Sequence, residues 1–266
     1  MSDSLDLFKK PQALDSAAHR QLRFSPNQPY HYAAKQLFAP ITLSEAGMIA
    51  REYALVFSDV DGSLPMALLG RARGSNSYVR SSGHWTARYV PAHIRRYPFV
   101  MAERPAQPEV NGATEAEKIV MFDTEAPHLQ AQTGDPLFDD QGGATATLRN
   151  VMQVLVAMDQ DSHNTLRVMA QLEALSLLVA QPVVIASKQG QPIGLQGLRV
   201  IDFDRFNALD AEQLAQLREA GALNLIYAHQ ISLANLRDGV LVETEVNAPS
   251  NSSGSISFDG IDWSKF

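Results

Sequence analysis

The chain has 266 residues, a formal net charge of −7 and no cysteine, with 45% hydrophobic and 19% charged residues. This composition is typical of a folded globular protein, and the length allows one large domain or two small ones. The absence of cysteine excludes disulfides, thiolate metal sites and a cysteine nucleophile, and the acidic balance argues against general nucleic-acid binding.

Residues 1–40 contain four prolines and are predicted to form an N-terminal arm. Ser44 is a candidate N-cap for a helix that ends near Tyr53. Beyond this helix, short apolar runs separated by turn residues predict a mostly antiparallel sheet. The expected strands cover residues 54–57, 64–69, 77–80, 84–90, 99–102 and 119–122, with a turn at 59–62, a short helix at 92–97 and a polar loop at 104–117.

In the C-terminal half, apolar residues recur every three or four positions between Ala146 and Ala180, which predicts helix, with a polar break at 159–164. Asp210 is the expected N-cap of a later helix, and Gly221 is its expected stop. Strands are expected at 182–186 and 198–203, and the later helices at 210–220 and 222–236. The predicted fold class is α+β, with a mostly antiparallel sheet in the N-terminal half and a helical C-terminal half that carries a small β insertion.

We expect a single compact domain over residues 41–245, or two lobes over 41–104 and 118–245. Residues 246–266 are predicted to be a flexible linker and an aromatic tail, because Asn, Ser, Gly and Pro dominate residues 247–257. No apolar run is long enough to cross a bilayer, and the N-terminus has no apolar signal region. A cytoplasmic location is therefore expected.

The sequence contains none of the common motifs for phosphate binding, serine hydrolases or zinc peptidases. Asp59 and Asp61 resemble the start of a calcium loop, but Gly70 stands at the twelfth position, where such a loop needs glutamate. We therefore predict a hairpin turn there, and no metal site or cofactor.

The most informative segment runs from Arg71 to Arg104. It holds seven arginines, no lysine and one acid, Glu103, so its formal charge is +6. Arginine binds carboxylate or phosphate through two parallel hydrogen bonds and stacks on aromatic rings, which are frequent here. The segment therefore predicts a site for an anionic small molecule or an acidic protein surface. The candidate binding residues are Arg71, Arg73, Asn76, Tyr78, Arg80, Arg88, Arg95, Arg96 and Tyr97.

Two interpretations of this segment stay open. The arginines either bind a partner or pair with carboxylates elsewhere in the acidic chain. An enzyme acting on an anionic small molecule or peptide would use His84 or His93 to move a proton. We expect a non-catalytic interaction protein instead, because no cofactor motif or nucleophile constellation occurs.

The aromatic tail carries Phe258, Trp263 and Phe266, with acids at Asp259 and Asp262. Aromatic anchors of this kind fill pockets on a partner or on a second copy of the chain. The tail therefore predicts a docking peptide and a homo-oligomer. The alternative is a terminus that frays or packs on its own chain.

Several strings resemble the signature of the bacterial SapC family, meaning the protein associated with surface layers and not the transporter permease. They are LPMALLG at 64–70, GSNSYV at 74–79, GHW at 83–85, YVPAHIRRYPF at 89–99 and, later, GALNLIYAHQISL at 221–233. The resemblance covers about residues 30–240. It implies an accessory role near a bacterial surface layer, nutrient-uptake systems or flavin-dependent halogenases, and it implies no catalytic residue.

Overall fold

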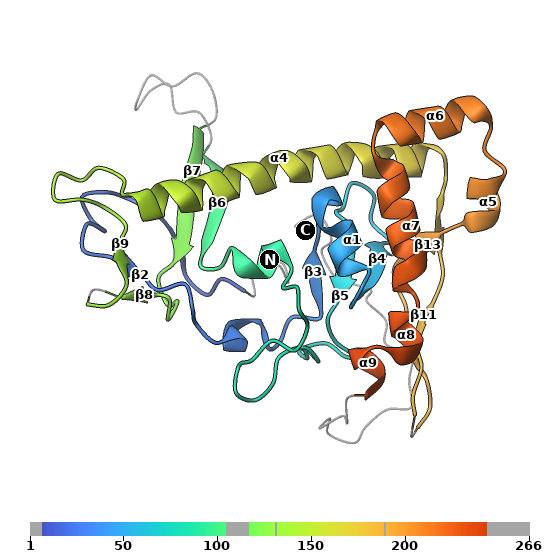
Figure 1. The fold of residues 1–266 in the computed structure, drawn as a ribbon, viewed down its shortest axis with the longest axis horizontal. Helices are drawn as coiled ribbons and strands as arrows, with labels where there is room; N and C mark the ends of the chain where they lie inside the picture. The colour runs from blue at the N-terminus through green and yellow to red at the C-terminus, as the bar shows by residue number, and fades with distance from the viewer. Residues whose placement is uncertain (1–6, 105–116, 131, 189, 244–266) are drawn as a thin grey trace. The chain divides into compact units, whose positions relative to one another are not determined.

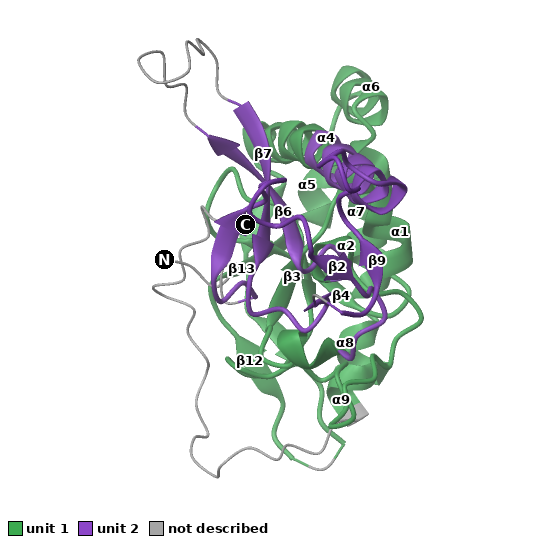
Figure 2. Ribbon diagram, turned by 90° about the vertical axis from the view of Figure 1, so that its left-hand side faces the viewer, with its two compact units in different colours: residues 1–4, 30–94, 161–266 green, residues 5–29, 95–160 purple. Residues whose placement is uncertain are grey.

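The computed structural model describes residues 7–104, 117–130, 132–188 and 190–243, which adopt an α+β fold (Figure 1). The chain forms two compact units, each assembled from separated stretches of sequence (Figure 2). Among the described residues, unit 1 comprises 30–94, 161–188 and 190–243, and unit 2 comprises 7–29, 95–104, 117–130 and 132–160. Helix α4 (Ala146–Ala174) begins in unit 2 and ends in unit 1.

Unit 1 contains a five-stranded antiparallel sheet with the strand order β10-β13-β4-β5-β3. Its strands are β3 (Phe38–Pro40), β4 (Ala54–Ser58), β5 (Met66–Leu68), β10 (Leu178–Ala180) and β13 (Leu198–Ile201). Every residue of β4 is buried, as expected for an apolar run at the centre of a sheet. A separate ribbon pairs β11 (Val183–Ile185) with β12 (Ile193–Leu195).

Besides the C-terminal part of α4, the described helices of this unit are short apart from α6 and α7. They are η1 (Tyr30–Ala33), η2 (Leu43–Glu45), α1 (Ala46–Ile49), α2 (Ala92–Arg95), α5 (Phe203–Asn207), α6 (Ala211–Glu219), α7 (Ala222–Ser232), α8 (Asn235–Asp238) and α9 (Val240–Glu243). Asp210 caps α6 as predicted, because its side chain accepts a hydrogen bond from the Gln213 amide at 2.8 Å. Gly221, with φ of 80°, separates α6 from α7. Helix α7 packs against α1 and β4 (Figure 1).

Unit 2 contains two three-stranded antiparallel sheets, ordered β1-β7-β6 and β8-β2-β9. The strands are β1 (Pro11–Ala13), β2 (Arg23–Phe24), β6 (Phe99–Arg104), β7 (Glu117–Asp123), β8 (Leu129–Gln130) and β9 (Asp135–Pro136). Leu148 and Leu155 of α4 pack with apolar residues of β6 and β7 in its core. The buried members of this core are Phe99, Phe122, Leu137, Phe138, Leu148 and Leu155.

The α+β class is confirmed, but the predicted division into a sheet half and a helical half is wrong. The five-stranded sheet joins β3, β4 and β5 to β10 and β13 from the C-terminal half. Local sequence patterns indicate whether a segment is a helix or a strand, but not which strand it pairs with. They therefore do not reveal that strands from both halves of the chain share one sheet. Helix α4 also crosses the polar stretch 159–164 without a break and ends before Ser176, which adopts a positive φ of 50°.

Ser44 is not a helix N-cap. Thr42 occupies that position and forms a capping box with Glu45, whose Oε2 accepts a hydrogen bond from the Thr42 amide at 3.2 Å. Ser44 lies inside the first turn, and its hydroxyl donates to Asp161 Oδ2 at 2.5 Å. The pattern Thr-x-x-Glu is itself a sequence signature of this cap.

Several predicted segments lie outside the described residues. These are most of the polar loop, the linker and the aromatic tail with Phe258, Trp263 and Phe266. Where the structure is described, no helix is both long enough and apolar enough to cross a membrane.

Candidate functional site

The arginine-rich segment is divided between the two units. Residues 71–94 belong to unit 1 and residues 95–104 to unit 2. The part in unit 1, called the basic segment below, carries four arginines and no lysine, aspartate or glutamate. Residues 71–94 therefore concentrate positive charge within an acidic chain.

The centre of the basic segment is a tight loop. The predicted strands at 77–80 and 84–90 reduce to one β-bridge between Val79 and Trp85. The Arg80 amide donates to the His84 carbonyl at 2.9 Å and closes a three-residue loop, in which Gly83 has the positive φ of 79° that such loops require. Arg80 and His84 therefore face each other at the base of the loop, and both side chains are exposed.

Buried aromatic side chains hold this loop to unit 1. Trp85 Nε1 donates to the Tyr53 hydroxyl at 2.7 Å, and that hydroxyl donates to the Tyr89 carbonyl. Tyr78 is fully buried, its ring centroid lies 4.4 Å from that of Tyr53, and its hydroxyl donates to the Glu52 carbonyl at 2.7 Å. Burial raises the pKa of both Tyr53 and Tyr78, so both phenols remain neutral donors.

Two glutamates bind the main chain of the basic segment. The Glu52 carboxylate accepts hydrogen bonds from the Arg88 amide at 3.0 Å and the Tyr89 amide at 3.2 Å. The buried Glu45 Oε1 accepts from the Tyr89 hydroxyl at 2.8 Å and from the Ala92 amide at 2.6 Å. Both carboxylates are thus engaged by amide and hydroxyl groups, not by guanidinium groups.

Because these two carboxylates bind amide and hydroxyl groups, they do not pair with the side chains of Arg80 and Arg88. Both arginine side chains are exposed. Within the described part of the chain, neither guanidinium makes a hydrogen bond or an ion pair. Their charges are therefore available at the surface, which favours the binding interpretation over internal pairing for these two residues.

Other candidates in the basic segment have different surroundings. Asn76 is buried, and its side chain donates to the Ala33 carbonyl at 2.9 Å and accepts from the Tyr78 amide at 2.9 Å. Arg71 is half-buried, and this burial lowers its pKa, whereas Arg73 is exposed. Neither arginine lacks a partner. The buried side chains of Asn76 and Tyr78 therefore stabilise the basic segment through their hydrogen bonds, and their binding role stays a prediction.

The three candidates beyond Ile94 belong to unit 2, whereas His93 belongs to unit 1. Arg95 is exposed and has a partner, while Arg96 is half-buried, and burial lowers its pKa to about 10. Tyr97 follows the end of α2 and is buried, and its hydroxyl donates to Asp123 Oδ2 at 2.9 Å. His93 is half-buried in α2. The structure therefore does not gather all predicted residues on one face of one unit.

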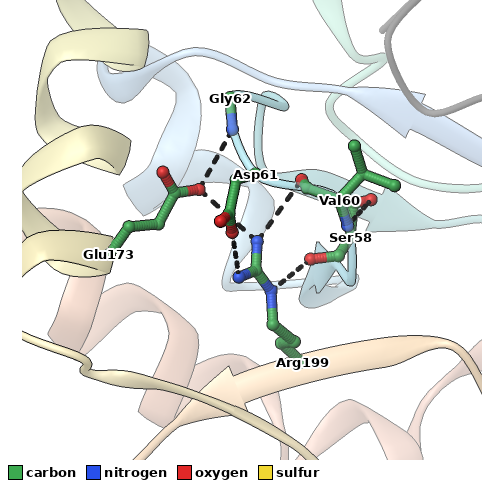
Figure 3. Close-up of polar contacts among 6 residues, drawn as sticks. All are labelled: Ser58, Val60, Asp61, Gly62, Glu173 and Arg199. Carbon is green, nitrogen blue, oxygen red and sulfur yellow. Dashed lines mark hydrogen bonds and ion pairs between the residues drawn. The ribbon is translucent and has the colours of Figure 1, made fainter.

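Residues 59–62 form a hairpin turn between β4 and β5, as predicted, and Arg199 of β13 stabilises it (Figure 3). The guanidinium donates to Asp61 Oδ1 at 2.6 Å, to the Val60 carbonyl at 3.3 Å and to the Ser58 carbonyl. Glu173 accepts from the Gly62 amide at 3.1 Å and lies 3.4 Å from Arg199 Nη2. The residues described by the structure include no cluster of three His, Asp or Glu that could hold a metal ion.

Replacing Arg199 with methionine is expected to lower the free energy of unfolding by about 2–3 kcal/mol, because the largely buried Glu173 carboxylate and two carbonyls lose a charged donor. Urea denaturation measures this loss. Lys118→Met is the matched control, because Lys118 pairs with Asp159 at the surface of unit 2, where such pairs contribute at most about 1 kcal/mol. Equal losses of unfolding free energy in the two variants would contradict the role of Arg199 in stabilising the turn at 59–62.

Sequence reasoning missed the acidic residues that support the site. The Thr-x-x-Glu pattern at 42–45 is the sequence signal for Glu45, and the prediction of Ser44 as the N-cap does not use it. Glu52 and Asp123 have no local signature. The amides that bind Glu52 lie 36 and 37 residues away along the chain, and the Lys9 and Lys10 amides lie 114 and 113 residues from Asp123.

Comparison with known proteins places these features in a family. The chain has no significant match among curated proteins or solved structures. The family model SapC matches residues 14–238, which is most of the 266-residue chain and includes the whole basic segment. The match agrees with the resemblance carried by residues 64–99 and 221–233. The chain therefore belongs to the SapC family.

Proposed function

We propose that this chain is a non-catalytic accessory protein that binds an acidic partner through the basic segment. One observation carries the proposal: Glu45 and Glu52 hold the segment by its main-chain amides, while the guanidinium groups of Arg80 and Arg88 are exposed and unpaired within the described residues. Guanidinium groups in this setting bind carboxylates through paired, charge-assisted hydrogen bonds.

The charge distribution supports a protein partner. The whole chain carries −7, so an acidic surface is repelled by most of it and attracted by the basic segment. Such a contrast orients an acidic partner and makes its binding weaken with salt. We propose that this partner belongs to the surface-layer or nutrient-uptake systems that the family resemblance implies.

Hexaglutamate labelled with fluorescein is the probe for this surface. Replacing Arg80 and Arg88 with glutamine is expected to weaken its binding by about 2- to 30-fold, since each exposed ion pair contributes about 0.2–1 kcal/mol. Fluorescence anisotropy at two salt concentrations measures the change.

The matched control is Arg218→Gln with Arg237→Gln, which removes two exposed arginines of α6 and α8 in the same unit. If both double variants weakened hexaglutamate binding equally, the loss of net positive charge alone would explain the effect, and the proposal would be overturned. Binding of inorganic phosphate that depends on Arg80 and His84 would favour the alternative, an enzyme acting on an anionic small molecule.

A further inference from the structure

We propose that Arg96 anchors a second binding site, in unit 2, that takes a small oxyanion: the carboxylate or phosphate group of a small molecule. The site is separate from the basic segment, because that segment ends at residue 94 and belongs to unit 1. The inference therefore goes beyond the proposed function and does not depend on it.

The turn that joins α2 to β6 fixes the backbone of Arg96. The Phe99 amide donates a hydrogen bond to the Arg96 carbonyl at 2.8 Å and closes this turn. The next side chain, that of Tyr97, is buried and binds Asp123 through its hydroxyl at 2.9 Å. The backbone from which the Arg96 side chain extends is therefore held by hydrogen bonds on both sides of the turn.

The Arg96 side chain is enclosed but lacks hydrogen bonds. Its Nε is buried and makes no hydrogen bond, while the residue as a whole keeps part of its surface exposed. In the parts of the chain that the structure describes, no other group donates to or accepts from this side chain. Buried polar atoms in folded proteins are nearly always hydrogen-bonded, and a bound ion is one of the few explanations for those that are not.

The positive charge of Arg96 also has no counter-ion among the described residues. Burial alone lowers its pKa to about 10, the direction expected for a cation that no nearby carboxylate stabilises. Asp123, the acid that holds the same turn, already accepts hydrogen bonds from three amides and the Tyr97 hydroxyl. Because a buried unpaired charge is costly, an anion from solution gains binding free energy by neutralising Arg96.

The guanidinium group determines the class of ligand. Its parallel N–H donors match two oxygens of a carboxylate or a phosphate, whereas a chloride ion is a single point charge. Since Nε is covered and the residue keeps part of its surface, an anion reaches the guanidinium from solvent and is partly shielded from water once bound. Such shielding strengthens charge-assisted hydrogen bonds. An enclosed arginine of this kind fits a small oxyanion, whereas the exposed Arg80 and Arg88 suit a broad acidic surface.

Thermal unfolding of the full chain in sodium phosphate and in sodium acetate tests the site. Each oxyanion replaces chloride at constant ionic strength and low millimolar concentration, because concentrated phosphate stabilises any folded protein. A ligand that binds only the folded chain raises its melting temperature by mass action. At roughly ten times the dissociation constant of the oxyanion, the expected rise is about 3–6 °C. A response to phosphate alone assigns a phosphorylated ligand, and a response to acetate alone assigns a carboxylic acid.

Two variants of Arg96 separate the charge from its planar geometry. Arg96→Met removes the charge at similar volume, so it should melt no lower than the native chain in chloride and should not respond to either oxyanion. Arg96→Lys keeps the charge without the planar donors, so its half-saturating oxyanion concentration should be several-fold higher. Arg20→Met is the matched control, because Arg20 is an exposed arginine of the same unit, and it should respond as the native chain does.

Several results would overturn the inference. One is a native chain whose melting temperature shows no saturable rise with either oxyanion, and another is an equal rise in Arg96→Met. A response that Arg80→Gln with Arg88→Gln removes would place the oxyanion on the basic segment instead. If Arg96→Met does not fold, Arg96→Lys decides: the same half-saturating concentration as in the native chain contradicts recognition by the Arg96 guanidinium.

Discussion

Replacing Asp123 with asparagine is expected to lower the free energy of unfolding by about 3–5 kcal/mol. The Asp123 carboxylate is fully buried in unit 2 and accepts four hydrogen bonds. Oδ2 accepts from the Lys9 amide and the Tyr97 hydroxyl, both at 2.9 Å. Oδ1 accepts from the Lys10 amide at 3.0 Å and the Glu125 amide at 3.1 Å. Urea denaturation followed by circular dichroism measures the loss.

The expected loss of stability in Asp123→Asn is large because the Asp123 carboxylate is charged. Burial by itself raises the pKa of Asp123, but the hydrogen bonds outweigh it and the pKa is lowered, so the folded protein holds the ionised carboxylate. Asparagine turns one acceptor oxygen into an NH₂ group that faces two donors. Glu125→Gln is the control, because that side chain is exposed and should change stability by less than about 0.5 kcal/mol. If Asp123→Asn lowered the free energy of unfolding no more than Glu125→Gln does, the hydrogen bonds to the buried Asp123 carboxylate would not stabilise the fold.

Replacing His229 with alanine is expected to cost about 4 kcal/mol, because two buried hydrogen bonds are lost and a cavity remains. The side chain is fully buried on α7. Its Nδ1 donates to the Leu55 carbonyl at 2.9 Å, and its Nε2 accepts from the Ile201 amide at 3.2 Å. Thermal and urea unfolding measure the change, with the exposed neighbour Gln230→Ala as the control.

The position of His229 explains why its loss is severe. The β4–β13 ladder pairs Leu198 with Ser58, and the same register places Leu55 opposite Ile201. The His229 imidazole bridges the Leu55 carbonyl and the Ile201 amide, so at this position the side chain takes the place of direct backbone pairing between β4 and β13. The Leu55 amide in turn donates to Ser232 Oγ of α7 at 2.9 Å. Comparable stability of His229→Ala and Gln230→Ala would rule out this structural role.

His229 also makes stability depend on pH. Burial lowers its pKa to about 4, although its hydrogen bond to Leu55 acts in the opposite direction. The unfolded chain, with a histidine pKa of about 6.5, takes up a proton before the folded chain does, so stability falls as pH decreases from about 6.5 to about 4. Between pH 7 and pH 5 this one group should remove about 2 kcal/mol.

Urea titrations of the native chain and of His229→Asn at the two pH values test this dependence. The variant should lose less stability between pH 7 and pH 5 than the native chain does. An equal loss in both would show that His229 does not carry this dependence. Burial also lowers the pKa of His128 to about 4, and this second histidine remains in both proteins.

The sequence by itself determined the features that act over a few residues. The apolar run of β4, the turn at 59–62 and the Asp210 cap of α6 appear where the residues predict them. Each depends on backbone preference, side-chain periodicity or a hydrogen bond to a near neighbour. The α+β class, the charge of the arginine-rich segment and the SapC family strings are likewise legible in the residue order.

Only the tertiary structure decided how the predicted site is divided and supported. Tyr97 and Arg80 belong to different units, although 17 positions separate them, whereas Ser58 lies beside Arg199 across 141 positions. Glu45 and Glu52 bind amides 36 to 47 residues away. Strand pairing and burial are set by the packing of distant segments, and the charge of an arginine does not reveal whether that packing will cover it.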